Sequence, residues 1–248
     1  MYDQPMSEAE LRTQPNADEV ARRMLCLDML QHRRDAEEAF LKSPSEDELS
    51  EREDDVEAML SFLRESGLWE FLSDEEIRAF ETPLGEWKDD QYIDATWRVE
   101  SLAVITWALG MIKRLPGFDE PVEAETLEDV LDIDNWADLV ANAVLRDRDE
   151  IERARDIAAL WDWRAQVGTP PYEEPEDEAE IAEEAKSAQE AGLISTLAQG
   201  DLVARGKPYS ELNEDELEEL ASIALERHYA LNWLCGFSDD WDNVPTDE

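Results

Sequence analysis

A signal for the start of an α-helix recurs along this chain, and apolar residues at helical spacing follow it. In a capping box, the N-cap side chain and an acidic side chain three residues later bond backbone N–H groups that the first helical turn leaves free. The signal begins at Asn16, Ser45, Ser73 and Asn213. No run alternates apolar and polar residues with period two, and no Asn-Gly or Asp-Gly hairpin turn occurs. The pattern predicts an all-α fold.

The apolar stripes, and the glycines and prolines that end them, divide the chain into helices. At 248 residues and 42% hydrophobic, the chain has enough apolar material for a large core. We expect a single globular helical domain of about eight to nine helices over 16–248, preceded by an N-terminal extension over 1–15. The longest apolar pattern covers 92–115 and ends at Pro116. The other stripes fall at 20–27, 56–63, 77–80, 136–144, 151–165 and 217–235.

Segment 172–190 differs from the rest of the chain. It holds nine acidic residues and one lysine, and its apolar component is mostly alanine. Such a composition buries little apolar surface. We interpret the segment as an acidic insertion between core helices, either an exposed helix or a mobile linker.

The charge of the chain limits its partners. There are 65 acidic and 22 basic residues, a formal net charge of −43. A field this negative repels nucleic-acid backbones and anionic membrane faces, so we expect neither as a partner. The acids are spread along the sequence and lysines are few, which favours a coat adapted to concentrated salt. An ordinary acidic cytosolic protein and a nucleic-acid mimic stay open, but a mimic would gather its carboxylates on one face.

Several features indicate a cytoplasmic protein. Cys26 and Cys235 lie in apolar helical patterns with no disulfide framework, which is typical of buried free thiols in a reducing compartment. The longest uncharged apolar run, 101–112, is too short to span a bilayer. The first residues lack the basic and apolar regions of a signal peptide. The nine tryptophans argue against disorder and are expected in the core.

The chain lacks the common catalytic signatures. It has no phosphate-binding glycine loop, dinucleotide fingerprint, G-x-S-x-G elbow or HExxH motif. With two histidines, a histidine-rich metal site is hard to assemble, although carboxylates could hold Mg²⁺ or Mn²⁺. The tail 239–242 resembles a cation-binding loop but lacks the glycine and distal glutamate of an EF-hand. We therefore predict no cofactor and no metal.

His228 is the more informative histidine. It lies on the apolar stripe of the last predicted helix, close to Glu226 and Asn232, whereas His32 is expected at the surface. One interpretation is a buried imidazole whose nitrogens bond neighbouring side chains. The other is a general base or a ligand in a pocket.

Glu100 poses the same choice. It borders the uncharged run 101–112, so its carboxylate needs a cation or several donors. We expect it to meet an arginine from another helix, with Arg98 or Arg146 among the partners, as a buried structural pair. In the alternative, Arg98, Glu100 and His228 line a polar pocket.

Several short motifs resemble a known family, the domain of unknown function numbered 4272. The motifs are Trp97-Arg-Val-Glu100, Trp107-Ala-Leu-Gly110, Leu145-Arg146 with Glu150-Ile151, Gly206-Lys-Pro-Tyr209, Glu226-Arg-His-Tyr-Ala-Leu-Asn-Trp-Leu234, and Trp241-Asp242 with Thr246-Asp247. The resemblance extends from about Asp18 to the C-terminus; it implies a helical cytosolic fold and supplies no activity. It places six polar residues among the family's motif positions, and these form the candidate polar cluster: Arg98, Glu100, Arg146, Glu226, His228 and Asp242.

The leading functional hypothesis is a helical protein without enzymatic activity that binds a protein partner, as an accessory or immunity-type factor. The first alternative is an enzyme, a carboxylate-metal hydrolase with Glu100 or Glu226 and His228 around a pocket. The second is the nucleic-acid mimic. An enzyme requires these groups to converge on a solvent-reachable cavity, whereas a binding protein leaves them sealed and paired.

Overall fold

The computed structural model describes residues 14–42, 45–123, 126–127, 135–172 and 177–246. Most of the expected N-terminal extension over 1–15 therefore lies outside the described residues. Helices dominate what is described, so the all-α prediction is confirmed, with one small sheet in addition. The helices are α1 (Ala17–Lys42), α2 (Glu46–Glu65), α3 (Asp74–Glu81), α4 (Asp89–Ala108), α6 (Trp136–Ala141), α7 (Arg148–Val167), α8 (Asp177–Glu190) and α9 (Glu214–Leu234), with 3-10 turns η1 (Leu68–Phe71), η3 (Tyr209–Glu211) and η4 (Trp241–Asn243).

The four predicted helix starts are all present. Asn16 and Glu19 exchange backbone-to-side-chain hydrogen bonds at the start of α1, and full capping boxes open α3 at Ser73 and α9 at Asn213. At α2 the Ser45 side chain accepts from the backbone of the third helical residue. These capping hydrogen bonds join residues that are three positions apart in the sequence, so the starts of helices can be predicted from the sequence.

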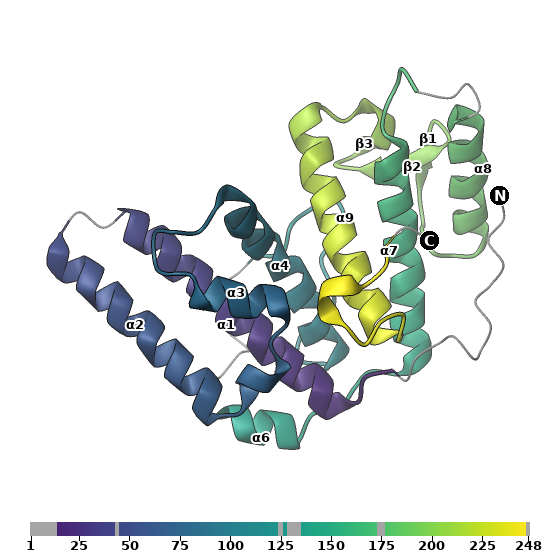
Figure 1. The fold of residues 1–248 in the computed structure, drawn as a ribbon. Helices are drawn as coiled ribbons and strands as arrows, with labels where there is room; N and C mark the ends of the chain where they lie inside the picture. The colour runs from purple at the N-terminus through teal and green to yellow at the C-terminus, as the bar shows by residue number, and fades with distance from the viewer. Residues whose placement is uncertain (1–13, 43–44, 124–125, 128–134, 173–176, 247–248) are drawn as a thin grey trace.

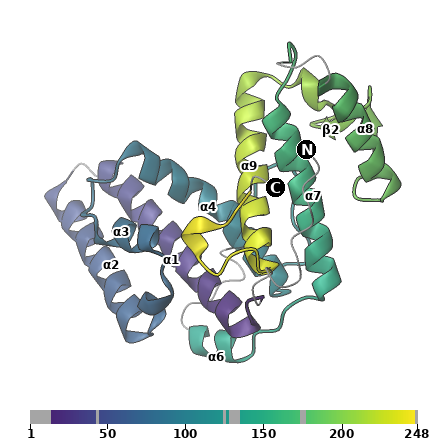
Figure 2. The same ribbon diagram turned by 45° about the vertical axis from the view of Figure 1, so that its right-hand side comes forward.

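Three long helices form the centre of the molecule. α4 packs between α1 and α9, and α9 runs along α7, as both ribbon views show (Figure 1, Figure 2). The main core is built largely from α1, α4 and α9, and it includes the uncharged stretch of α4. α2, η1 and α6 pack on α1 at one side of the molecule. Within the described residues no helix combines the length and the apolar character needed to cross a membrane.

Two helices end earlier than their apolar patterns predict. α4 stops at Ala108 instead of 115, because Gly110 has a φ of 72° and starts a different backbone path. α6 stops at Ala141, and Val144, expected on its apolar face, is 72% exposed. Apolar side chains continue past the ends of both helices, so the apolar pattern overestimates the length of each helix.

A small sheet was missed by the sequence prediction. Strands β1 (Leu197–Ala198), β2 (Asp201–Ala204) and β3 (Lys207–Pro208) form an antiparallel meander in that order. Both tight turns have two residues with positive φ, Gln199-Gly200 and Arg205-Gly206. Type I′ hairpin turns require this geometry, but they usually carry Asn-Gly or Asp-Gly. The strands are also too short to show an alternating pattern.

α8 corrects the interpretation of segment 172–190. Its apolar residues Ile181, Ala185 and Ala188 are buried, and the helix packs against β1, β2 and α7. Residues 173–176 of the segment lie outside the described part. A second, smaller core thus joins α8, the sheet, α7 and the start of α9. Within α8 the acidic side chains lie on the exposed face, and the opposite face is part of the fold.

Candidate functional site

The six residues of the candidate polar cluster do not form one site. They are distributed over four separate places in the fold. Glu100, His228 and Arg146 each belong to a different group of contacts, and only Arg98, Glu226 and Asp242 lie near one another.

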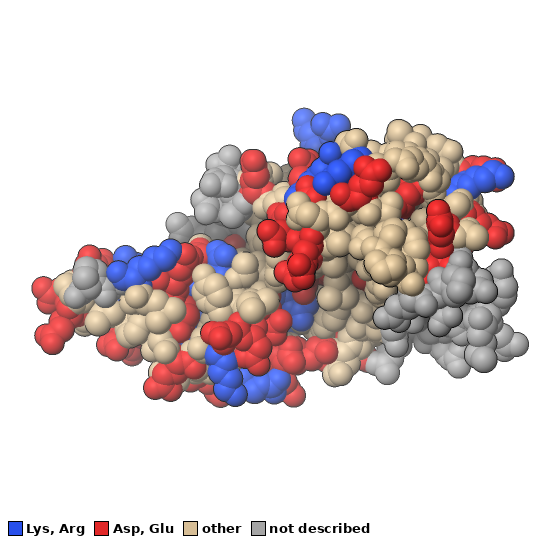
Figure 3. All heavy atoms as spheres, turned by 90° about the horizontal axis from the view of Figure 1, so that it is seen from above, with Lys and Arg blue, Asp and Glu red and all other residues tan. Residues whose placement is uncertain are grey.

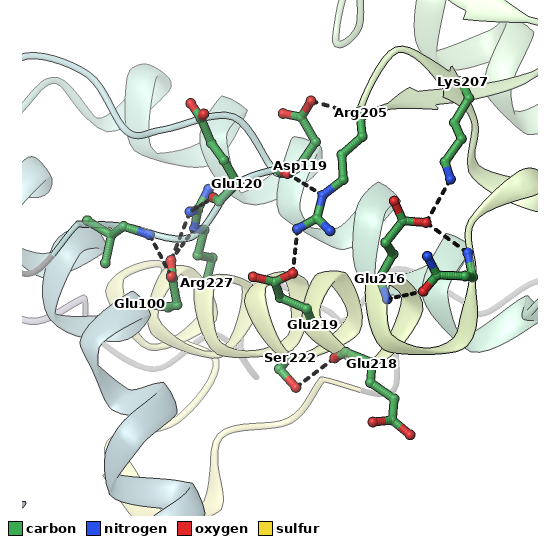
Figure 4. Close-up of polar contacts among 12 residues, drawn as sticks. Glu100, Asp119, Glu120, Arg205, Lys207, Glu216, Glu218, Glu219, Ser222 and Arg227 are labelled. Atoms are coloured by element: carbon green, nitrogen blue, oxygen red, sulfur yellow. Dashed lines mark hydrogen bonds and ion pairs between the residues drawn. The ribbon is translucent and has the colours of Figure 1, made fainter.

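Glu100 forms a buried ion pair that organises a loop. Its Oε2 lies 2.8 Å from Arg227 of α9, and both side chains are fully buried. Its Oε1 accepts from the backbone of Val122 at 2.8 Å, while Arg227 donates to carbonyl oxygens within 116–120 (Figure 4). The expected arginine from another helix is therefore present, but it is Arg227 and neither Arg98 nor Arg146.

Arg146 has a structural role at the end of α4. Its guanidinium donates to the carbonyls of Trp107, Ile112 and Lys113, and its backbone N–H donates to Ala108. The carbonyls of Trp107 and Ala108 belong to the last turn of the helix, whose C=O groups have no intrahelical partner, and those of Ile112 and Lys113 follow the helix. Arg146 therefore caps α4 and does not contact Glu100.

His228 lies in a sealed polar layer between α9, α7 and the C-terminal segment. Its Nδ1 is 2.8 Å from Asp162, and its Nε2 is 2.9 Å from Asn232 Nδ2. Asn232 also accepts from Arg155 Nε and donates to Pro245 O. Arg155 can only donate and a carbonyl can only accept, so the amide orientation is fixed. His228 Nε2 must then accept, and Nδ1 carries the hydrogen toward Asp162.

This layer does not suit a catalytic base. His228 is 1% exposed and both ring nitrogens are bonded to protein groups. Asp162, which sequence reasoning missed, lies between two tryptophans in the apolar stripe of α7. An acid in that position could have indicated a buried partner. His32 is at the surface as expected, with half of its side chain exposed.

Arg98 and Glu226 form a partly buried pair at the junction of α4 and α9. Arg98 Nη1 lies 3.2 Å from Glu226 Oε2, which also accepts from Ser101 at 2.7 Å. Burial raises the pKa of the Glu226 carboxyl, although Arg98 and Ser101 act in the opposite direction. The Arg98 guanidinium stacks on Tyr229, 4.5 Å from the ring centroid. Its charge is thus already compensated within the protein.

Trp241 of η4 lies between two such compensated arginines. Arg98 is 5.9 Å and Arg23 is 4.8 Å from its ring, and Arg23 is itself paired with Glu76 at 2.7 Å. The Tyr229 hydroxyl donates to the Trp241 carbonyl. The C-terminal segment is therefore held against α1, α4 and α9 by aromatic and cation contacts.

Asp242 and Trp241 each present one polar atom without a partner among the described residues. Asp242 Oδ2 accepts from the backbone of Glu75 at 3.0 Å, in the first turn of α3. The other carboxylate oxygen, Oδ1, is buried and makes no hydrogen bond to that part of the chain; the same holds for Trp241 Nε1. Buried polar atoms are normally paired, so these two atoms call for an explanation.

Both residues line a pocket of about 700 Å³ between α3 and α4. Its floor includes Leu30, Ala79 and Ala95, and the two alanines leave space where larger side chains would fill the interface. Its lining also includes five exposed carboxylates and two exposed cations: Glu75, Glu81, Glu86, Asp90, Asp94, Arg78 and Lys88. A second pocket of about 460 Å³ lies beside Trp241 and Asp242 toward Arg23.

The residues named for a hydrolase do not assemble a metal site. Across the described ranges, no three His, Cys, Asp or Glu side chains are grouped so that they could hold a metal ion. Glu100 pairs with Arg227 and Glu226 with Arg98 and Ser101, whereas His228 hydrogen-bonds Asp162 of α7.

Comparison with known families assigns the chain. The model of a domain of unknown function, DUF4272, matches residues 4–179. The chain belongs to the DUF4272 family. The match is shorter than the expected resemblance, because the stretch 226–234 and the rest of α9 lie beyond residue 179. Searches of curated proteins and of solved structures found no match to this DUF4272 protein.

Proposed function

We propose that this protein is a binding protein without enzymatic activity, an accessory or immunity-type factor whose partner is a basic polypeptide. The observation that carries the proposal is the arrangement of its polar residues. Glu100, Arg227 and His228 are sealed and paired within the protein instead of converging on one cavity. A catalytic site needs its acid, base and binding groups within reach of one substrate.

We further propose that the protein works in a salt-adapted cytosol. Figure 3 shows one face on which acidic groups are spread over the surface with basic groups beside them. A dispersed coat suits hydration and solubility in concentrated salt more than the imitation of a phosphate backbone, which needs one regular acidic surface. For this reason the mimic is the weaker alternative.

The choice of a basic partner follows from charge. At a net charge of −43 the chain attracts cationic surfaces and repels anionic ones. In molar salt this long-range attraction is screened within about 3 Å, so specificity must come from groups in direct contact. The acidic surface attracts cationic partners over a distance only at low salt. The residues in direct contact with a partner then determine which partner binds.

The test is affinity capture with the full-length chain as bait, from native cytosol at native salt. We expect one polypeptide of basic character to be retained in a stoichiometric complex, and calorimetry with the purified pair to give a saturable isotherm in molar KCl. In parallel, the chain is incubated with a native metabolite extract and Mg²⁺ or Mn²⁺. Turnover of a metabolite, with no polypeptide retained, would favour the enzyme instead.

A further inference from the structure

A layer of hydrogen-bonded side chains connects the interior of the protein to its C-terminal segment, residues 237–246. This segment follows α9 and folds back along it (Figure 1, Figure 2). Asp162 lies 2.8 Å from His228 Nδ1, and Asn232 Nδ2 lies 2.9 Å from His228 Nε2. The same Asn232 Nδ2 donates to the carbonyl of Pro245 at 2.7 Å. A single amide group therefore contacts both the imidazole and the backbone of the C-terminal segment.

Arg155 of α7 connects the layer to the other end of this segment. Its Nε donates to Asn232 Oδ1 at 2.9 Å, and its guanidinium lies 4.6 Å from the ring centroid of Phe237. Asn232 thus contacts Pro245 directly and is linked to Phe237 through Arg155. A change in the orientation of this one amide would reach both ends of the segment.

The layer is fully satisfied while the imidazole is neutral. A neutral histidine has one ring nitrogen that donates and one that accepts. The Asn232 amide is held by a donor, Arg155 Nε, and by an acceptor, the carbonyl of Pro245. Its NH₂ group therefore points at His228, whose Nε2 accepts while Nδ1 donates to Asp162.

Uptake of a proton by His228 removes that acceptor. In a charged imidazole both nitrogens donate, so Nε2–H meets the NH₂ group of Asn232 at 2.9 Å, a donor against a donor. A half-turn of the amide gives Nε2–H an oxygen, and a hydrogen bond from a charged donor is about twice as strong as a neutral one. The same turn points the amide oxygen at the carbonyl of Pro245 and the NH₂ group at Arg155 Nε. No orientation of the amide then suits all three of its neighbours.

Asp162 is the counter-charge of the protonated ring. It lies 2.8 Å from Nδ1 of His228, so a charged imidazole keeps this contact as an ion pair. Burial is the main cause that raises the pKa of Tyr209 to about 12, and the charge of Asp162 adds to it, so this phenol stays neutral. The contact that changes on protonation is therefore the one at Nε2.

Other charged groups on the elements around the layer are bonded elsewhere. On α4, α7 and α9 they form ion pairs: Arg98 with Glu226, Glu100 with Arg227, Arg164 with Asp201, and Arg155 with Asp156. In the C-terminal segment, Asp240 accepts from Asn243, and Asp242 accepts from the backbone of Glu75. The C-terminal segment contributes a carbonyl to the layer, that of Pro245.

We propose that this layer is a pH-sensitive switch, in which protonation of His228 turns the Asn232 amide, releases the carbonyl of Pro245 and opens the C-terminal segment. The inference goes beyond the proposed binding function and does not depend on it. Opening uncovers Trp233, which is 8% exposed in the closed state and packs edge-on against Trp241, with 5.3 Å between ring centroids. Acidification thus exposes an aromatic surface on α9.

The direction of the pH dependence follows from linkage. An open segment frees His228 Nε2 from the opposing donor, so the open state binds a proton more tightly than the closed state. The equilibrium constant for opening then rises as the pH falls, by at most about tenfold per pH unit for one proton. The segment is closed at high pH and opens at low pH.

Hydrogen exchange followed by mass spectrometry measures this opening. The backbone N–H groups of Phe237, Asp240, Asp242 and Asn243 are hydrogen-bonded, so their exchange reports on the segment. The full-length chain is compared from about pH 8 to about pH 5, where histidine is the side chain whose ordinary pKa gives a change of charge. Molar KCl limits the effect of pH on repulsion between surface carboxylates. Rates are corrected for the intrinsic pH dependence of exchange.

Two control variants isolate the contribution of the buried histidine. His32→Gln removes the half-exposed histidine and leaves His228 as the only one in the chain. Its ring ¹⁵N resonances then report the proton and the tautomer, which should be Nδ1–H at high pH. Glu226→Gln is needed because burial raises the pKa of that carboxyl, whose partner Arg98 lies 5.9 Å from the ring of Trp241.

Two further variants alter the layer itself. His228→Gln keeps a polar side chain that takes up no proton in this pH range. Asn232→Asp keeps an acceptor for Arg155 and for a charged imidazole, but it has no hydrogen to donate to Pro245. It therefore imitates the open state at every pH.

We expect exchange in 237–246 to rise at least about threefold from high to low pH in wild type and in both controls, the size of one lost hydrogen bond. The midpoint of the rise should coincide with the ring titration of His228. His228→Gln should lose the pH dependence, and Asn232→Asp should exchange as fast at high pH as wild type does at low pH.

Several outcomes overturn the proposal. They are unchanged exchange in wild type, an equal rise in His228→Gln, loss of the rise in Glu226→Gln, and an equal rise in peptides of α4, which would mean that the whole fold loosens. If His228→Gln does not fold, Asn232→Asp and the ring titration decide. Slow exchange in Asn232→Asp, or a midpoint away from the ring titration, then refutes the switch.

Discussion

At the level of single residues, arginine is the main connecting group of this fold. Among the residues that the structure describes, the three largest fully buried side chains are Arg33, Arg164 and Arg227. Arg33 pairs with Glu37, Arg164 with Asp201, and Arg227 with a glutamate of α4, and each also donates to backbone carbonyls. A guanidinium offers five donors in a fixed plane, so one side chain can join a carboxylate and a loop. The chain has few cations, and these three arginines form ion pairs in the interior instead of offsetting acidic charge at the surface.

The first prediction concerns the pair of Glu100 and Arg227. Glu100→Gln should lower the free energy of unfolding by about 3–5 kcal/mol, because it leaves a buried guanidinium without its counter-charge. The measurement is urea denaturation followed by circular dichroism. Glu100→Gln with Arg227→Met should recover part of the loss, since the unpaired charge is removed. An undestabilised Glu100→Gln would instead indicate an open pocket.

The second prediction concerns acid stability. Arg164 lowers the pKa of Asp201 although burial alone would raise it. A lowered pKa in the folded state stabilises the fold above the unfolded value of about 3.9, and this contribution is lost as pH falls below that value. Asp201→Asn should therefore be less stable than wild type at neutral pH, and the difference should shrink as the pH falls below about 4. Stability measured against pH for both proteins gives the difference, and a constant gap would contradict the assignment.

At the level of elements, local signals were predictable and tertiary choices were not. Capping boxes such as Ser73 with Glu76 act within one helical turn, so the sequence displays them directly. The need of Glu100 for a cation also followed from its apolar neighbours, but the choice of Arg227 depends on which helix packs against α4. The hairpin at Arg205 and Gly206 uses an uncommon turn sequence and was missed. The pocket was not predictable, because Ala79 and Ala95 face each other only after folding.

The third prediction concerns α8, which the sequence presents as a dispensable acidic segment. Ile181 is 3% exposed in the structure, so Ile181→Ala should lower the free energy of unfolding by about 2–5 kcal/mol. Glu183→Ala, on the exposed face of the same helix, is the control and should change little. Deletion of 177–190 should lower the melting temperature by several degrees for the same reason. A deletion variant that melts like wild type would restore the original interpretation.

At the level of the whole molecule, charge and packing oppose each other. The net charge of −43 is spread over a surface whose acids far outnumber its cations, and self-repulsion favours the expanded chain. The buried ion pairs do not reduce the repulsion between surface carboxylates. Each pair is neutral as a unit, and its cation lies inside the protein and not at the surface. The fold therefore depends on solvent ions to screen its surface.

The last prediction follows from that dependence. Screening acts over about 30 Å at 0.01 M salt and about 3 Å at 1 M, so molar KCl removes most of the repulsion between surface carboxylates. Salt also weakens exposed ion pairs such as Arg148 with Glu152, but pairs of this kind contribute only about 0–1 kcal/mol each. The melting temperature at neutral pH should thus rise substantially from low to molar KCl. Closer to the isoelectric point, near 4.1, carboxylates are partly protonated and the rise should be smaller. Calorimetric scans at both pH values separate screening from a general salt effect, and a flat or falling profile at neutral pH would refute adaptation to salt.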